Sequence, residues 1–183
     1  MALVPKDTMT VADFLAWAET QDQGAFELWE GRIIAMAPQT LAHVRVKRAA
    51  ADALRAAINT AGAPCESFID GAAVVIDDHT SLQPDAIVFC GEALSGTLSA
   101  IPNPLIVVEV LSPSTQHIDK TRKLQCYFEL PGLQHYLIID HERGAVIHHR
   151  RQSDNLILTA LIRSGDIVLD PPGLTIALHG LLG

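Results

Sequence analysis

The sequence contains few cysteines and no long apolar run. Its three cysteines, Cys65, Cys90 and Cys126, are odd in number and widely separated, which argues against a disulfide framework and against a closely spaced zinc cluster. We therefore expect three reduced, mostly buried thiols. No stretch of the sequence approaches the roughly 20 apolar residues that a membrane-spanning helix needs, so we expect no membrane partner.

Targeting signals and positive charge are also scarce. The N-terminal sequence MALVPKDTMT has neither the basic region nor the long apolar region of a secretory signal, and we take the cytoplasm as the default location. The chain has 13 Lys and Arg against 21 Asp and Glu, a formal net charge of -8. This balance disfavours a protein that coats nucleic acid non-specifically, because neutralising phosphates requires clustered Lys and Arg. It does not exclude a site that is locally basic.

The residues that are abundant indicate a folded globular chain. Hydrophobic residues make up 49% and charged residues 19% of the 183 residues, a composition typical of globular proteins. This length suits one compact domain with a substantial core, and no break in composition indicates a second. We expect a single domain over residues 1–183.

Two helices and a hairpin are predicted in the first third of the chain. Residues 10–19 have apolar positions at helical spacing behind Thr10 as N-cap. The stretch FELWEGRIIAMAP predicts a hairpin that turns at Glu30-Gly31, where the turn needs the positive φ of glycine. Residues 40–61 predict a long alanine-rich helix that ends near Gly62. His43 falls at the start of its buried side.

The remaining sequence indicates several strands and one more helix. ESFIDGAAVVI and LQPDAIVFC predict paired strands, and residues 91–103 predict a loop that can line a site. The strand at 105–111 stops at Ser112-Pro113, Ser114 or Thr115 can cap a helix that runs to about Leu130, and HYLIID predicts the next strand. Strand, helix and strand then form a crossover with parallel pairing. NLILTALI and DIVLD predict further strands after a hairpin turn at residues 142–144, so the fold class is α+β, with a mixed sheet flanked by helices.

Glu109 conflicts with the strand that contains it. The surrounding sequence LIVVEVL is apolar at both parities, the pattern of a strand that is covered on both faces. An isolated carboxylate in that setting is strongly unfavourable, so it must be protonated, paired with a cation or bound to a metal. We favour a metal site over a structural ion pair with Lys or Arg, because stability alone rarely rewards a buried pair.

Asp85 and Lys123 are the candidate partners of Glu109. Hard divalent cations prefer carboxylate oxygens presented from rigid elements, and Asp85 stands where the strand in QPDAIVFC begins. Lys123 lies on the helix that follows the Glu109 strand, where it can hold the attacking water or offset charge in the transition state. Lys120 is its local competitor. Taken alone, Asp85 could be a turn-capping residue and Lys123 a surface lysine.

Several motifs occur in a specific order between residues 10 and 141. They are FELWEGRIIAMAP, the helix after it, PDAIVF, LIVVEVLSPST and DKTRKLQCYFELPGLQHYLIID. Together they resemble the Uma-two family, restriction-endonuclease-like proteins of the PD-(D/E)XK nuclease superfamily. The resemblance implies a restriction-endonuclease-like fold and hydrolysis of DNA.

The resemblance also implies roles for individual residues. It places a Mg²⁺ or Mn²⁺ ion on Asp85 and Glu109. The third position of the superfamily's E-x-K pattern is Leu111 here, so the resemblance implies a lysine displaced onto the next helix, which matches Lys123. Glu27 matches an acidic residue that such folds often supply near the N-terminus.

The predicted function is therefore a metal-dependent DNA endonuclease. Asp85 and Glu109 are the predicted metal ligands, Lys123 the residue that orients water or stabilises charge, and Glu27 an accessory acid. Further candidate site residues are His43 and Tyr127. Glu27 could instead pair with Arg32 across the hairpin, and His43 could be a satisfied histidine at a helix end.

Other functions remain as alternatives. The acidic net charge favours a catalytically inactive nucleic-acid-binding or assembly module that keeps the nuclease fold, and the substrate could be RNA or another phosphodiester. The apolar C-terminal strands and tail could form a homodimer edge. A zinc site at His141, His148 and His149 is rejected, because adjacent histidines on a strand point to opposite faces. We expect these histidines to face solvent.

Overall fold

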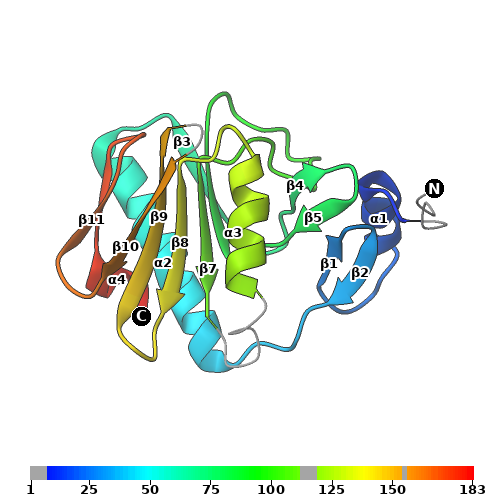
Figure 1. Cartoon of the computed structure of the whole chain (residues 1–183), viewed down its shortest axis with the longest axis horizontal. Coiled ribbons are helices and arrows are strands. Elements are labelled where there is room, and N and C mark those ends of the chain that lie inside the picture. The colour runs from blue at the N-terminus through cyan, green and yellow to red at the C-terminus, as the bar shows by residue number, and fades with distance from the viewer. Residues whose placement is uncertain (1–7, 112–118, 154–155) are drawn as a thin grey trace.

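The computed structural model describes residues 8–111, 119–153 and 156–183 (Figure 1). The expected strand end at Ser112-Pro113 and the expected helix cap at Ser114 or Thr115 lie outside these residues. In the described part, no helix has the length and apolar composition that a membrane span requires.

A six-stranded mixed sheet is the centre of the fold. Its strand order is β10-β9-β8-β7-β6-β3. These strands are β3 (Cys65–Ile69), β6 (Ala86–Cys90), β7 (Ile106–Val110), β8 (His135–Asp140), β9 (Ala145–Ser153) and β10 (Leu156–Ile162). Strands β7 and β8 are parallel and are joined by α3 (Asp119–Glu129), which confirms the predicted crossover.

Helices cover the two faces of this sheet. Helix α2 (Leu41–Ala61) lies on one face and α3 on the other (Figure 1). Within β7, Ile106, Val108 and Val110 belong to the core cluster that contains α2 residues, whereas Val107 belongs to the cluster that contains α3 residues. Side chains alternate between the faces of a strand, so Glu109 shares the α3 side with Val107.

A second, four-stranded sheet lies beside the first, at the N-terminal end of the molecule (Figure 1). Its order is β2-β1-β5-β4, with β1 (Phe26–Trp29), β2 (Arg32–Ala35), β4 (Val74–Asp77) and β5 (Thr80–Leu82). Strands β1 and β2 form the predicted hairpin, whose turn residues Glu30 and Gly31 have φ of 47° and 76°.

The predicted pairing of the two stretches between residues 66 and 90 is confirmed, but the pair is divided between the two sheets. Four strands occupy this stretch: β3 pairs with β6 in the large sheet, and β4 pairs with β5 in the small sheet. Asp70 and Gly71 have φ of 46° and 77°. Two successive residues in the left-handed region turn the chain sharply, which directs β3 and β4 into different sheets.

Both predicted N-terminal helices are confirmed, together with the predicted Thr10 cap and the predicted end at Gly62. Thr10 and Thr40 are the N-caps of α1 (Val11–Ala18) and α2, and each side-chain oxygen accepts a backbone N–H of the first turn. Gly62 ends α2 with φ of 60°, a conformation that glycine adopts at low cost. The Thr40 cap accepts its hydrogen bond from His43 N at 3.2 Å, which fixes the position of His43 at the start of the helix.

The C-terminal region contains elements that the sequence pattern did not reveal. The predicted strand DIVLD is β11 (Asp166–Leu169), and it pairs with a further strand, β12 (Leu174–Ala177). The short helix α4 (Leu178–Leu182) follows directly, and its Leu178 and Leu181 join the core cluster on the α2 side of the large sheet. The leucine-rich tail therefore completes the core.

The expectation of three reduced cysteines is wrong for two of them. Cys65 and Cys90 form a disulfide, while Cys126 is free and half-buried. Cys65 and Cys90 are direct partners in the antiparallel β3–β6 pair, where opposite side chains lie close together. Strand pairing, which brings together residues far apart in sequence, explains why the spacing did not indicate the bond.

The expectation of solvent-facing histidines is also wrong for two of the three, since His148 and His149 are only 7% and 8% exposed. They do point to opposite sides, as expected for adjacent strand residues: His148 Nε2 lies 2.9 Å from Nδ1 of the buried His135, and His149 stacks on Tyr136. Burial lowers the pKa of His135 and that of His148 to about 4. Both rings are therefore neutral at pH 7.

Candidate active site

Glu109 projects from the centre of β7 towards α3. Its Oε1 accepts hydrogen bonds from Lys123 Nζ at 3.0 Å and from the Tyr127 hydroxyl at 2.8 Å. Lys123 and Tyr127 are one turn apart on α3, so they present their polar ends to the same point. The side chain of Glu109 is 14% exposed, which leaves an opening towards solvent.

Glu27 holds the same lysine from the opposite side. Its Oε1 lies 3.1 Å from Lys123 Nζ and also accepts the backbone N–H of Gln83 at 3.0 Å, while its Oε2 accepts the Trp29 indole N–H at 2.9 Å. Glu27 is 6% exposed and Lys123 is 4% exposed. Because its hydrogen bonds go to Lys123, Gln83 and Trp29, Glu27 does not form the alternative ion pair with Arg32.

Asp85 is held at the start of β6, next to β7. Its Oδ2 accepts the backbone N–H of Val110 at 2.7 Å, and its Oδ1 lies 3.3 Å from both His43 Nε2 and Lys47 Nζ. His43 and Lys47 are one turn apart on α2. Asp85 therefore lies where groups from α2 and from β7 both reach it.

The two predicted metal ligands have opposite pKa shifts. Burial raises the pKa of Glu109 to about 8, against the opposing effect of Lys123, and the nearby charges of Asp85 and Glu27 raise it further. Burial also acts to raise the pKa of Asp85. The hydrogen bonds from His43 and Val110 and the charge of Lys47 together outweigh the effect of burial, so the pKa of Asp85 is lowered. Asp85 is thus ionised at neutral pH, and Glu109 takes up a proton more readily than an ordinary carboxyl group.

Tyr127 acts as a donor to Glu109. Burial raises the pKa of its hydroxyl well above the ordinary value, and the charge of Glu109 adds to this shift. The phenol is therefore protonated at all ordinary pH values, and its O–H donates to Glu109 Oε1. Tyr127 was among the predicted site residues, and its contact with Glu109 places it in this cluster.

The oxygen donors of Asp85 and Glu109 fit a hard divalent cation. Both are carboxylates, and Glu109 Oε2 has no hydrogen-bond partner among the residues that the structure describes. The same residues contain no group of three or more Asp, Glu, His or Cys side chains placed to hold a metal ion. A two-carboxylate site suits Mg²⁺, which commonly keeps several waters and completes its shell with oxygens of the substrate.

All six predicted site residues thus lie in two connected clusters. One contains Glu27, Glu109, Lys123 and Tyr127, and the other contains Asp85 and His43. The prediction did not include Lys47, which is 1% exposed and also contacts Gln39 Oε1 at 2.7 Å and Asp70 Oδ1 at 2.6 Å. A signal for it was present, because Lys47 precedes Leu54 by seven residues and so falls on the apolar stripe of α2.

The topology and the carboxylate cluster define a restriction-endonuclease-like protein. The crystal structure of a putative nuclease from Anabaena variabilis has the same fold: the TM-score is 0.74, the match covers 95% of this chain and 97% of that one, and 19% of the residues are identical. The chain belongs to the Uma2 family, described as "Putative restriction endonuclease", whose pattern it matches over residues 11–180.

Two curated relatives come from the cyanobacterium Synechocystis sp., and both are uncharacterized proteins. One is 26% identical over 179 residues, covering 94% of this chain and 90% of the relative. The other is 29% identical over 166 residues, covering 88% of this chain and 92% of the relative. The similarity to both relatives extends over most of each chain.

Proposed function

We propose that this protein is a metal-dependent endonuclease that hydrolyses phosphodiester bonds in DNA. The observation that carries the proposal is the buried Lys123 ammonium, which bridges Glu27 and Glu109 beside the carboxylate of Asp85. A buried set of charges gives little stability for its cost. Strongly shifted pKa values in a partly open cluster are characteristic of functional sites.

Asp85 and Glu109 would hold a Mg²⁺ or Mn²⁺ ion. When bound, such an ion supplies Lewis-acid polarisation of the scissile phosphate and lowers the pKa of a coordinated water. Lys123 is the charge-stabilising group, because its ammonium is fixed next to Glu109. Glu27 positions Lys123, and Tyr127 orients Glu109 by donating to its Oε1.

His43 and Lys47 serve the other carboxylate. Both contact Asp85 Oδ1, and they keep this residue ionised and correctly oriented. Lys47 and Lys123 place two cations among the carboxylates of the site, while the net charge of -8 belongs to the whole chain. A site can attract phosphate locally despite an acidic surface elsewhere.

Cleavage of plasmid DNA tests the proposal. We expect the purified protein to nick supercoiled plasmid with Mg²⁺ or Mn²⁺ and to stop when EDTA is added, because the two carboxylates alone cannot activate water. The Asp85→Ala and Glu109→Ala proteins, purified in the same way, control for contaminating nucleases. Parallel incubation with RNA identifies the preferred phosphodiester. Equal nicking by the parent and both variants would refute the site assignment.

The rival function is an inactive nucleic-acid-binding or assembly module. It is favoured by the lack, within the described residues, of a group of three or more metal-binding side chains. Calorimetry with Mn²⁺ separates the two functions: an endonuclease should bind the ion through Asp85 and Glu109, whereas a folded protein that binds no Mn²⁺ and cuts nothing supports the module.

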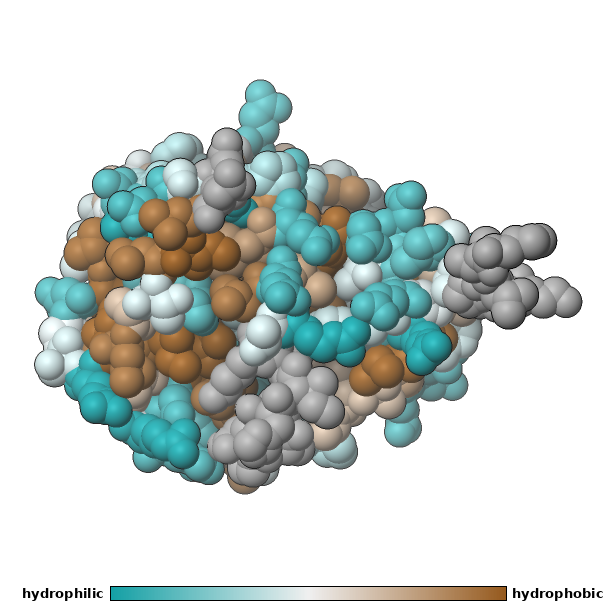
Figure 2. Space-filling view, viewed as in Figure 1, coloured by the Kyte–Doolittle hydropathy of each residue, from teal (hydrophilic) through white to brown (hydrophobic). Residues whose placement is uncertain are grey.

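We also propose that the protein forms a homodimer through β10. This strand is the last in the sheet order, and its Leu156, Leu158 and Leu161 are 51%, 46% and 56% exposed. Apolar residues gather over this side of the molecule (Figure 2).

An unprotected apolar edge strand favours pairing with another strand. Light scattering should therefore give twice the mass of the chain. The double substitution Leu158→Lys with Leu161→Lys should restore the monomer. A monomeric parent at micromolar concentration would refute this proposal.

A further inference from the structure

We propose that Asp70 holds the Lys47 ammonium back from Asp85 and so keeps this carboxylate open to the divalent ion, an inference that rests on the proposed function. Lys47 is 1% exposed and lies in the second turn of α2, and Asp70 directly follows β3. Strands β3 and β6 are antiparallel partners, with Ile69 opposite Ala86. Asp70 and Asp85 are therefore neighbours at the same end of this strand pair, and Lys47 contacts both of them.

The three oxygen atoms around the ammonium are not equivalent. Lys47 Nζ donates hydrogen bonds to Gln39 Oε1 at 2.7 Å and to Asp70 Oδ1 at 2.6 Å. Asp85 Oδ1 lies 3.3 Å from the same nitrogen, which is longer than the roughly 2.7–2.9 Å of a charge-assisted N–H···O bond. The ammonium is thus bonded to Gln39 and Asp70, while its contact with Asp85 is looser.

This difference matters because an ammonium and a divalent ion compete for the negative charge of one carboxylate. A buried ammonium needs an anionic partner. Asp70 supplies this partner, so the charge of Asp85 remains available to the metal. Without the charge of Asp70, Asp85 would be the remaining carboxylate in contact with Lys47, and the ammonium would close onto its Oδ1.

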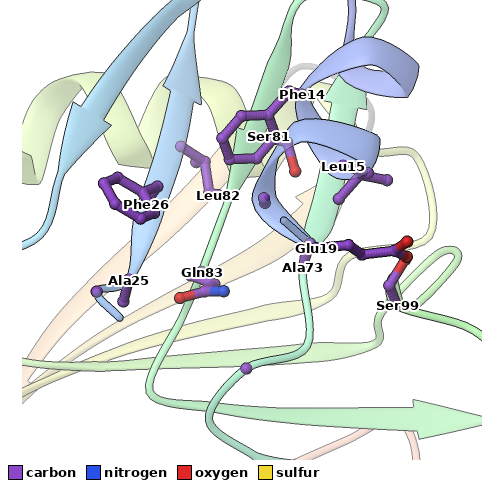
Figure 3. Close-up of a pocket in the computed structure, with 13 residues that line it drawn as sticks. Phe14, Leu15, Glu19, Ala25, Phe26, Ala73, Ser81, Leu82, Gln83 and Ser99 are labelled. Carbon is purple, nitrogen blue, oxygen red and sulfur yellow. The ribbon is translucent and has the colours of Figure 1, made fainter. Parts of the chain in front are cut away.

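The backbone at Asp70 allows this role to be tested without disturbing the fold. Its φ of 46° lies in the left-handed region, which Asp and Asn enter more readily than most residues. Its side chain is 63% exposed, and the next residue, Gly71, lines a cavity of about 230 Å³ on the α1 face of the small sheet (Figure 3). The turn therefore borders open space, and replacing Asp70 by Asn changes its charge without changing core packing.

Calorimetry with Mn²⁺ on the protein without DNA tests the inference. Asp70→Asn removes the charge that holds Lys47, so we expect about tenfold weaker Mn²⁺ binding, a usual effect of losing a residue that orients a metal ligand. Lys47→Met removes the competing ammonium. In the Lys47→Met background, Asp70→Asn should therefore change the Mn²⁺ affinity by less than about twofold.

The matched control is Asp52→Asn, which changes the net charge of the chain by the same amount. Asp52 is also on α2, its side chain is 52% exposed, and it pairs with Arg48 and Arg55. Its removal should leave the Mn²⁺ affinity within about twofold of the parent. Circular dichroism shows whether each variant is folded. If Lys47→Met does not fold, Lys47→Gln gives a second background with a neutral side chain that can still form hydrogen bonds.

Two results would overturn the inference. Equal Mn²⁺ affinities of the parent and Asp70→Asn would show that Lys47 does not compete with the ion. An equal weakening by Asp70→Asn in the parent and in the neutral Lys47 background would show that Asp70 acts on the ion directly, by its charge or as a ligand, and not through Lys47.

The failure of this inference is distinguishable from that of the proposed function. Suppose that the parent cuts DNA and binds Mn²⁺, that Asp85→Ala abolishes this binding and that Asp70→Asn leaves it unchanged. The nuclease function then stands, and only the role of Asp70 is refuted. A parent that binds no Mn²⁺ and cuts nothing refutes both.

Discussion

Replacing Lys123 by Met should reduce DNA cleavage by about 100- to 1,000-fold, the usual cost of removing one preorganised group that stabilises charge in a transition state. It should also lower the free energy of unfolding by about 3–5 kcal/mol, because Glu27 and Glu109 then share a buried space without the ammonium that pairs them. Plasmid nicking and urea denaturation measure the two effects.

A second substitution separates the two effects. In the Lys123→Met background, Glu109→Gln removes the unpaired acid and keeps an acceptor for Tyr127, so most of the lost stability should return while cleavage should not. Arg122 is on the same helix with a side chain that is 52% exposed, and Arg122→Met should change stability by less than about 1 kcal/mol. Parental cleavage by Lys123→Met would contradict the role that we assign to this residue.

The stability of the protein should fall steeply between pH 6.5 and pH 4 because of His135 and His148. Their pKa values in the folded state are about 4, against an ordinary value near 6.5 in the unfolded chain. The unfolded state therefore binds more protons in this range. The contribution of the two histidines to the free energy of unfolding is fully present above pH 6.5, is lost as the pH falls and is gone below pH 4. The loss amounts to about 3 kcal/mol for each histidine.

The hydrogen bonds of the pair suggest a matched control. His135 Nε2 lies 2.8 Å from the carbonyl oxygen of Pro171, so Nε2 carries the proton and donates, and Nδ1 must accept from His148 Nε2. His148→Gln keeps a side-chain N–H donor for His135 but cannot titrate. Urea denaturation at several pH values should show a smaller loss between pH 6.5 and pH 4 in this variant. Equal losses in the parent and the variant would contradict the prediction.

The local pattern of the chain was sufficient to predict much of the fold. Helices α1 and α2, the hairpin at Glu30-Gly31 and the crossover through α3 are confirmed, because caps, apolar periodicity and turn residues are local signals. The pairing of the strands between residues 66 and 90 was predicted, but their division between two sheets was not, since the chain direction changes at Asp70 and Gly71 without a change in composition. The single domain over residues 1–183 stays a prediction.

The candidate site was predictable in part. Asp85 and Glu109 stood out because each carboxylate adjoins an apolar strand, and the family resemblance added Lys123 and Glu27. Lys47 was missed because a lysine on an alanine-rich helix usually lies in solvent. Its burial follows from Asp70 and Asp85, two partners that reach it from other parts of the chain.

The sequence by itself determined that Glu109 needed a partner, because the apolar residues on both sides of it exclude a solvated charge. Only the tertiary structure decided which groups meet it. Lys123 bonds Glu109 across 14 positions of the chain and Glu27 across 96, and separations of this kind are set by strand order and helix packing. Periodicity describes one element at a time, and therefore it shows that a residue is buried without showing what lies against it.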